Sequence, residues 1–165
     1  SVAAAMGGAT KTTSVDVANR SLEKTKEQFA ANDIDPETQQ IYVMDVFDYF
    51  KYALKKQLTF DTVVVDPPSF ARTKKRTFSV VKDYGTLVAQ ITPLVAPKGT
   101  LVLSTNAANV TESQFQQMIE QGIREADGNR RYRIVLKKGL PSDFAVPAST
   151  PLSDYLKVFF IEFNN

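Results

Sequence analysis

Hydrophobic and polar positions follow two alternating periods along the first three quarters of the chain. Short apolar or β-branched runs predict strands at residues 11–15, 40–45, 60–66 and 99–105. Apolar residues at helical spacing, with capping and stop residues, predict helices at residues 1–8, 18–32, 47–58, 79–96 and 111–125. Because strands and helices alternate, the sequence predicts right-handed βαβ units and a parallel sheet, and hence an α/β fold.

Three details of this pattern are specific enough to be tested. The predicted apolar faces of the second and third helices consist of Ala18, Leu22, Thr25 and Phe29, and of Phe50, Leu54 and Leu58. Strand 60–66 is nearly all apolar, so we expect it to be buried on both faces. Pro97-Lys98-Gly99 predicts a turn before strand 99–105, and residues 71–78 predict a basic loop.

The last part of the chain has a different pattern. Residues 131–139, RYRIVLKKG, and 154–163, DYLKVFFIEF, are two β-rich runs with no helix between them. They predict an antiparallel pair that closes one edge of the sheet. With 165 residues and no internal linker, we expect a single domain over residues 1–165.

Composition excludes several kinds of chemistry. The sequence contains no cysteine and no histidine. Disulfides, thiol nucleophiles and cysteine–metal sites are therefore excluded, as is a Ser-His-Asp triad within this chain. A net charge of +2 is too small to indicate a nucleic-acid partner by itself. No apolar run approaches the roughly 20 residues that span a bilayer.

Three of the predicted strands end in an acid, namely Asp16, Asp45 and Asp66. In doubly wound sheets, ligands bind at the carboxyl ends of the strands, and an acid there accepts hydrogen bonds from ribose hydroxyls. Asp45, followed by Val46 and Phe47, has the residue types to hold an adenine by its amino group and its ring face. The alternative is that each acid only caps the helix that follows it.

The third of these strands runs directly into Asp66-Pro67-Pro68-Ser69-Phe70. Each proline fixes its own φ and restricts the residue before it, so the segment is stiff and extended. The prolines also remove two N–H donors, which leaves carbonyl acceptors beside the Asp66 carboxylate. Phe70 can stack on a planar base. These groups predict a site that holds a base nitrogen, and the alternative is a rigid turn with a buried phenylalanine.

At this point the sequence resembles a known family. DPPSF resembles motif IV of the S-adenosylmethionine-dependent methyltransferases. The segments SVDVANRSLEKTKEQFAAND, MDVFDYF, DPPSFARTKKR and SDYLKVFFIEF together resemble the bacterial 23S ribosomal RNA methyltransferases that often have an N-terminal PUA domain. The resemblance covers essentially the whole chain, and it implies a cytoplasmic enzyme with a doubly wound, Rossmann-like class I methyltransferase sheet.

The resemblance also implies roles for individual residues. Asp16 and Val17 would bind the ribose of S-adenosyl-L-methionine, and Asp45, Val46 and Phe47 its adenine. Asp66 would contact the methionine amino group and, with Pro67, Pro68 and Phe70, form the catalytic site around the target base. No metal is implied.

The sequence departs from the family pattern at two places. The first strand and the glycine-rich motif I are expected upstream of residue 1, so we expect a fragment that is inactive alone and has exposed strand edges. Such edges predict pairing with a second copy, as a homodimer. Members that methylate pyrimidine C5 use a cysteine where this chain has Ser104-Thr105-Asn106. A purine nitrogen is therefore the predicted methyl acceptor, with Ser104 and Asn106 on the substrate side.

The predicted RNA contacts come from the basic run after motif IV, for which a solvated surface is the alternative, and from Tyr84, for which a core or surface tyrosine is the alternative. The basic residues of this run are Arg72, Lys74, Lys75 and Arg76. A second basic cluster follows residue 129 and comprises Arg130, Arg131, Arg133, Lys137 and Lys138, for which a solvated surface is the alternative. Two other functions remain open: methylation of a protein or small-molecule nitrogen, and RNA binding without catalysis.

Overall fold

The structure is a computed structural model that describes residues 1–73, 76–145 and 154–164. The chain forms two compact units, Ser1–Tyr52 and Ala53–Asn165, and each is described by itself. Lys74 and Lys75, two of the predicted RNA contacts, lie outside the described residues.

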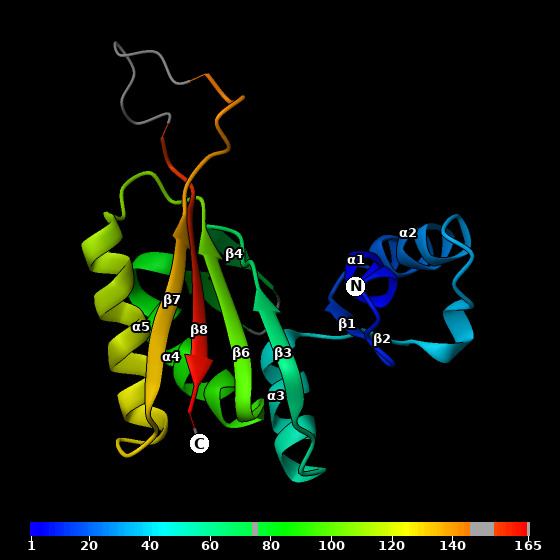
Figure 1. Cartoon of the computed structure of the whole chain (residues 1–165), viewed down its shortest axis with the longest axis horizontal. Coiled ribbons are helices and arrows are strands. Elements are labelled where there is room, and N and C mark those ends of the chain that lie inside the picture. The colour runs from blue at the N-terminus through cyan, green and yellow to red at the C-terminus, as the bar shows by residue number, and fades with distance from the viewer. Residues whose placement is uncertain (74–75, 146–153, 165) are drawn as a thin grey trace. The chain divides into compact units, whose positions relative to one another are not determined.

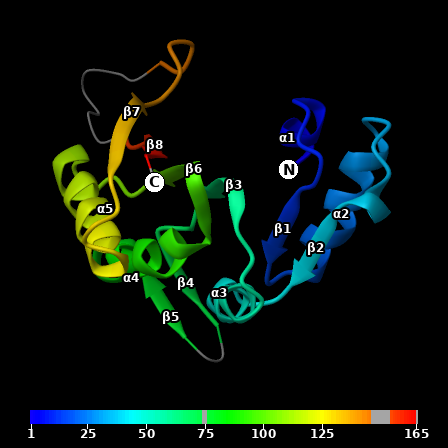
Figure 2. The same cartoon turned by 60° about the horizontal axis from the view of Figure 1, so that its bottom comes forward.

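The first unit contains a two-stranded parallel sheet with helices in its connections. Its elements are α1 (Val2–Met6), β1 (Thr13–Asp16), α2 (Asn19–Ala30), the 3₁₀ helix η1 (Pro36–Thr38), β2 (Gln40–Val43) and the greater part of α3 (Val46–Lys55). Strands β1 and β2 pair in parallel from Thr13 opposite Gln40 to Asp16 opposite Val43 (Figure 2). Both strands therefore end at the same edge, as predicted for a βαβ unit.

The helix faces in this unit only partly match the prediction. Leu22, Thr25 and Phe29 are the more protected residues of α2, as predicted, whereas Ala18 precedes the helix and is exposed. Phe50 of α3 is buried, but Leu54 is 43% exposed, so its predicted burial is wrong. Leu54 lies in the last turn of α3, and the buried residues of this helix end at Ala53.

The second unit is built on a four-stranded sheet in the order β3-β6-β8-β7 (Figure 1). These strands are β3 (Phe60–Val65), β6 (Val95–Thr105), β7 (Tyr132–Lys138) and β8 (Lys157–Phe163). β3 and β6 are parallel, while β8 is antiparallel to both β6 and β7. The predicted antiparallel pair is confirmed, and β7 is the edge strand that it adds to the sheet.

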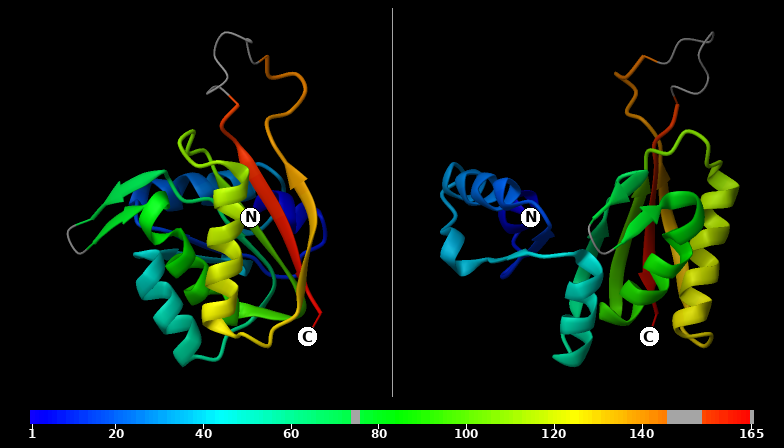
Figure 3. Two further views of the ribbon diagram at one scale, coloured as in Figure 1. Left: turned by 90° about the vertical axis from the view of Figure 1, so that its left-hand side faces the viewer. Right: turned by 180° about the vertical axis from the view of Figure 1, so that it is seen from behind.

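Two helices, α4 (Val80–Ile91) and α5 (Glu112–Ala126), cover one face of this sheet (Figure 3, right). The ring of Phe115 on α5 lies 4.9 Å from that of Tyr84 on α4 and 5.2 Å from that of Phe159 on β8. The helices approach so closely that a Cβ on Gly122 would lie 2.4 Å from the Gly85 carbonyl oxygen. A side chain at position 122 would therefore separate α4 from α5.

Three details of the second unit differ from the prediction. The predicted burial of β3 on both faces is wrong, because Val64 on this edge strand is 69% exposed. The predicted turn at residues 97–99 lies inside β6 as a register irregularity, where Lys98 has a φ of 60°. Residues 70–79, predicted mainly as a loop, contain an antiparallel hairpin of β4 (Phe70–Arg72) and β5 (Thr77–Ser79). A 3₁₀ helix, η2 (Thr92–Leu94), links α4 to β6.

The helices within the described ranges are all too short or too polar to cross a membrane.

Candidate functional site

The centre of the site is the carboxylate of Asp66, immediately after β3. Its Oδ1 accepts a hydrogen bond of 2.5 Å from the Ser104 hydroxyl near the end of β6. Because β3 and β6 are parallel neighbours, Asp66 and Ser104 lie at the same edge of the sheet. Asp66 itself is exposed, whereas Ser104 is buried. The Ser104 hydroxyl therefore orients one carboxylate oxygen of Asp66. The other oxygen, Oδ2, forms no hydrogen bond with a described residue.

A second hydrogen bond joins the loops after the same two strands. The Ser69 hydroxyl donates to Asn106 Oδ1 over 2.7 Å. Ser69 is also held through its backbone, since its carbonyl accepts from the Val80 N–H at the start of α4. We call the contact between Ser69 and Asn106 the Ser69–Asn106 bridge. It fixes the Pro67–Pro68 segment against the end of β6 and leaves the Asn106 amide nitrogen without a described partner.

The Pro67 and Pro68 carbonyls form no hydrogen bond with any residue that the structure describes. Together with Asp66, they place several acceptors on this segment.

Tyr84, predicted to contact RNA, is completely buried in the core. Its hydroxyl donates to the Ser104 carbonyl oxygen over 2.8 Å. Burial is the main cause that raises the pKa of Tyr84 far above its ordinary value, and the charge of Asp66 adds to it. The prediction of an RNA contact is therefore wrong. Tyr84 supports the end of β6 from α4, so it acts on the site through Ser104.

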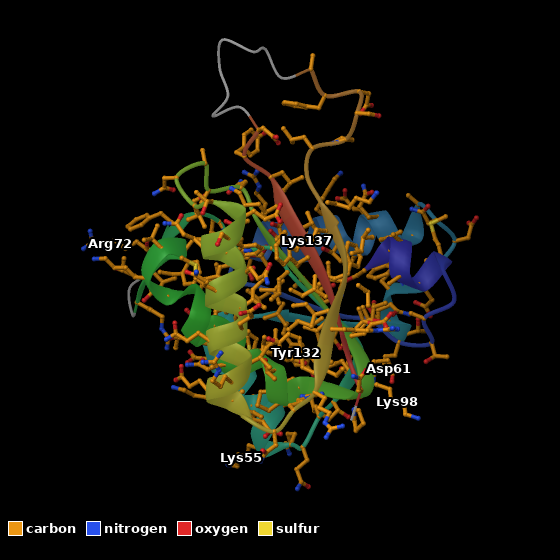
Figure 4. The ribbon with its side chains drawn as sticks, turned by 60° about the vertical axis from the view of Figure 1, so that its left-hand side comes forward. Lys55, Asp61, Arg72, Lys98, Tyr132 and Lys137 are labelled. Carbon is orange, nitrogen blue, oxygen red and sulfur yellow. The ribbon has the colours of Figure 1, made fainter. Side chains whose placement is uncertain are left out.

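Phe70 is 62% exposed and begins the β4–β5 hairpin, so the alternative of a buried phenylalanine is wrong. The hairpin projects from the second unit (Figure 3, left). Arg72 ends β4, and Figure 4 shows its side chain extended away from the ribbon. The Arg76 carbonyl oxygen accepts from the Thr73 N–H over 2.8 Å, which closes the turn of the hairpin. An exposed aromatic ring and basic residues therefore stand on one short hairpin next to Asp66.

In the first unit, Asp16 is the last residue of β1, and Asp45 lies two residues after the end of the adjacent parallel strand β2. Each carboxylate accepts a hydrogen bond from the N–H two residues later, that of Ala18 over 2.8 Å and that of Phe47 over 2.9 Å. The capping alternative is thus observed for Asp45 at the start of α3, whereas the Ala18 N–H lies before the first residue of α2, so Asp16 does not cap that helix. The other oxygen of each acid has no partner among the described residues and remains available to a ligand.

The three apolar residues of this predicted cofactor site differ in exposure. Val17 is 61% exposed, Val46 is half-buried at the start of α3, and Phe47 is buried.

Lys157 is a residue of this region that sequence reasoning did not identify. It begins β8 opposite Thr105, and its ammonium donates to the carbonyl oxygens of Ala107 and Tyr155 over 2.9 and 2.8 Å. Burial lowers the pKa of Lys157, and Asp154 opposes that shift. The only sequence signal is its position in a β-rich run, which does not reveal the contact with Ala107.

The second basic cluster is largely engaged within the protein. Arg130 donates to three backbone carbonyls, Arg133 pairs with Glu162, and Lys137 pairs with Glu112. These contacts favour the structural alternative over an RNA-binding surface for this cluster.

A hollow of about 860 Å³ lies in the first unit, between α1, β1 and α2. It is lined by residues 1–28 alone and includes none of the strand-end acids. Its charged residues include Arg20, Glu23, Lys24 and Glu27, and Lys24 pairs with Glu27. We assign it no role in the site. The described residues also contain no group of three or more acidic side chains that could hold a metal ion.

Comparison with known proteins gives consistent results. YwbD of Bacillus subtilis (strain 168), named as a ribosomal RNA large subunit methyltransferase, is 52% identical over 98% of this chain and 40% of that protein. A ribosomal RNA large subunit methyltransferase of Deinococcus radiodurans is 29% identical over 98% of this chain and 39% of that protein. The chain therefore spans about 40% of the length of these relatives.

Among solved structures, a methyltransferase complexed with SAH superposes with a TM-score of 0.88 and 48% identity. The match covers 98% of this chain and 41% of that one. It confirms the predicted Rossmann-like class I methyltransferase fold. A model of the S-adenosylmethionine-dependent methyltransferase family matches residues 1–151. With the strand-end acids and the DPPSF segment arranged as described, the chain belongs to the family of S-adenosylmethionine-dependent methyltransferases.

Proposed function

We propose that this chain is the catalytic part of a cytoplasmic enzyme that methylates a purine nitrogen in 23S ribosomal RNA, using S-adenosyl-L-methionine. The observation that supports this most strongly is the cluster at the shared edge of β3 and β6. There Ser104 orients Asp66, and the Ser69–Asn106 bridge fixes the proline segment. The names of the relatives support large-subunit ribosomal RNA as the substrate class.

The residues of this cluster fit an amino group on the base. Asp66 Oδ2 and the Pro67 and Pro68 carbonyls are acceptors, so they can hold the hydrogens of an amine and direct its lone pair away from the loop. Asn106 retains donor capacity for a neighbouring ring nitrogen or carbonyl of the base. The exposed ring of Phe70 offers a face on which a base can stack. Such stacking is possible for any base and would hold a base that has been flipped out of its RNA fold.

The first unit fits the nucleoside part of the cofactor. Asp16 and Asp45 each have one carboxylate oxygen free beside the ends of two adjacent parallel strands. Free carboxylate oxygens at this position accept hydrogen bonds from ribose hydroxyls and from an exocyclic amine. S-adenosyl-L-methionine, when bound, supplies a methyl group already activated on a sulfonium. The protein therefore has to align the acceptor nitrogen with this methyl group. Holding the two reactants close and correctly oriented accelerates the transfer strongly.

Methyl transfer from radiolabelled S-adenosyl-L-methionine tests this proposal. We expect the intact protein to label unmodified 23S ribosomal RNA, and nuclease digestion to return the label in a methylated purine nucleoside. Small-subunit RNA and ribosomal proteins serve as matched acceptors in the same assay. Label in protein, in a pyrimidine or in no macromolecule would overturn the proposed substrate.

Replacing Arg72 with alanine is expected to weaken RNA binding about equally for all sequences. Arg72 is exposed on the hairpin beside Phe70, where it can contact backbone phosphates. Each phosphate contact adds roughly 0.7–0.9 to the slope of log affinity against log salt, so that slope should fall by about one. Fluorescence anisotropy with labelled RNA at several salt concentrations measures both quantities.

Arg124→Ala is the matched control, because Arg124 is an exposed arginine on the outer side of α5. An unchanged salt slope for Arg72→Ala, or an equal decrease for Arg124→Ala, would contradict the assignment of the hairpin to RNA.

We also propose that two copies of the chain pair as a homodimer. The support is β3, an edge strand with the apolar Val64 exposed, since unpaired edge strands tend to pair with another chain. Light scattering should give the mass of two chains, and Val64→Lys should reduce it to one, because a charge on an edge strand opposes pairing. A single-chain mass for the unaltered protein would refute the homodimer.

A further inference from the structure

We propose that Lys157 is a positioning residue for the methyl acceptor, which holds the segment after β6 so that Asn106 can form the Ser69–Asn106 bridge. This inference rests on the proposed function for its consequence in catalysis. Lys157 acts through other residues, and we assign it no contact with the cofactor or the substrate.

Strand pairing places Lys157 beside the end of β6. Its backbone pairs with Thr105, the last residue of β6, and the adjacent pair is Val158 with Ser104. The start of β8 is therefore fixed beside the strand end that contains the Asp66 partner. Strand pairing determines where the lysine side chain begins, so its reach is limited to the loops around this edge.

The Lys157 side chain contacts the turn that follows β6. The ammonium donates to the carbonyl oxygen of Ala107, which also accepts from the Val110 N–H over 3.1 Å. Ala107 and Val110 are both buried, and the Ala107 N–H donates to the Thr105 hydroxyl oxygen. Residues 105–110 thus form a tight turn whose central carbonyl is held by a charged donor from another strand.

This turn is connected to the acceptor site through Asn106. Asn106 precedes Ala107 directly, so the conformation of the turn determines where the Asn106 side chain starts. Its Oδ1 accepts from Ser69, and Ser69 belongs to the proline segment beside Asp66. Lys157, Asn106 and Ser69 therefore link β8, the loop after β6 and the loop after β3 in series.

A lysine is suited to this role. An ammonium has three donors and no acceptor, and two of them are used here, for Ala107 and Tyr155. Charge-assisted hydrogen bonds are about twice as strong as neutral ones, so one side chain can fix a short turn. The lowered pKa of this amine agrees with an ammonium that is drawn into the protein and away from water.

The test compares Lys157→Met with Lys138→Met in the intact protein. Lys138 is exposed on β7, opposite Val158, and the two substitutions remove the same charge. For Lys157→Met we expect the single-turnover rate of RNA methylation to fall roughly tenfold, the size expected when one charge-assisted hydrogen bond is lost. The affinity for S-adenosylhomocysteine should match that of Lys138→Met, whereas the melting temperature should be lower, because two charge-assisted hydrogen bonds are lost.

A double-mutant cycle with Ser69→Ala distinguishes positioning from a general structural effect. If Lys157 acts through the bridge, the second substitution should add little to the first, because both remove the same constraint. Lys157→Arg should recover part of the rate. Independent effects of the two substitutions, an unchanged rate for Lys157→Met, or a parallel loss of cofactor affinity would each overturn the inference.

Amide hydrogen exchange separates this inference from the proposed function. Lys157→Met should speed exchange at residues 107–110 about tenfold, while Lys138→Met leaves it unchanged. If the unaltered protein transfers no methyl group to ribosomal RNA, the proposed function fails, and this exchange measurement still decides whether Lys157 holds the turn. Unchanged exchange in Lys157→Met would refute that role.

Discussion

Replacing Asp66 with asparagine is expected to lower the rate of methyl transfer by about 10²–10³-fold, the range found when one group that acts directly in the transition state is removed. The Asp66 carboxylate accepts from Ser104 through Oδ1, and Oδ2 is free among the described residues. An amide of the same shape replaces one acceptor oxygen with a donor, which opposes the hydrogens of the target amine. Single-turnover transfer from labelled S-adenosyl-L-methionine to ribosomal RNA measures the effect.

The matched control for this substitution is Asp61→Asn on the same strand. Asp61 is exposed near the start of β3 and forms no side-chain hydrogen bond with a described residue. We expect its rate to stay within about twofold of the unaltered protein, because surface substitutions usually have small effects. Equal rates for the Asp66 and Asp61 variants would rule out the proposed site, provided that both proteins remain folded.

The strand-end positions of Asp16 and Asp66 could be predicted because a run of apolar or β-branched residues shows where a strand ends. Asp16 and Asp66 each follow such a run directly, and parallel pairing brings neighbouring strand ends to one edge. The contacts that orient these acids could not be predicted in the same way. Ser104 reaches Asp66 across 38 positions, and Lys157 reaches Ala107 across 50. Such contacts depend on strand order, which local periodicity does not determine.

The fold was predicted where local pattern decides it and missed where pairing decides it. The alternation of strands and helices correctly predicted the α/β class, and the two β-rich runs with no helix between them correctly predicted the antiparallel pair at the C-terminal end. The apolar run of β3 predicted burial on both faces, but whether a strand is central or at an edge depends on its neighbours. Likewise, the basic run after Asp66 contained no strand pattern, and the hairpin there forms through pairing of Phe70 with Ser79.

Replacing Arg130 with methionine is expected to lower the free energy of unfolding by about 2–3 kcal/mol, as for a lost set of hydrogen bonds to a charged group. The guanidinium donates to the carbonyl oxygens of Thr92, Val95 and Ala96, and its Cζ lies 3.9 Å from the centre of the Phe163 ring. Methionine fills part of the space and packs on Phe163, but it removes the guanidinium donors from these three carbonyls. Urea denaturation followed by circular dichroism measures the change.

Two further variants separate the shape of the guanidinium from its charge. Arg130→Lys keeps the charge but loses the planar fork with which arginine contacts all three carbonyls, so we expect about half of the loss. Arg133→Met removes an exposed ion pair with Glu162, and such pairs contribute only about 0.2–1 kcal/mol. If Arg130→Lys is as stable as the unaltered protein, the charge alone accounts for the effect. If Arg130→Met is no less stable than Arg133→Met, the three carbonyl contacts contribute little to stability, and Arg130 would again be available for RNA binding.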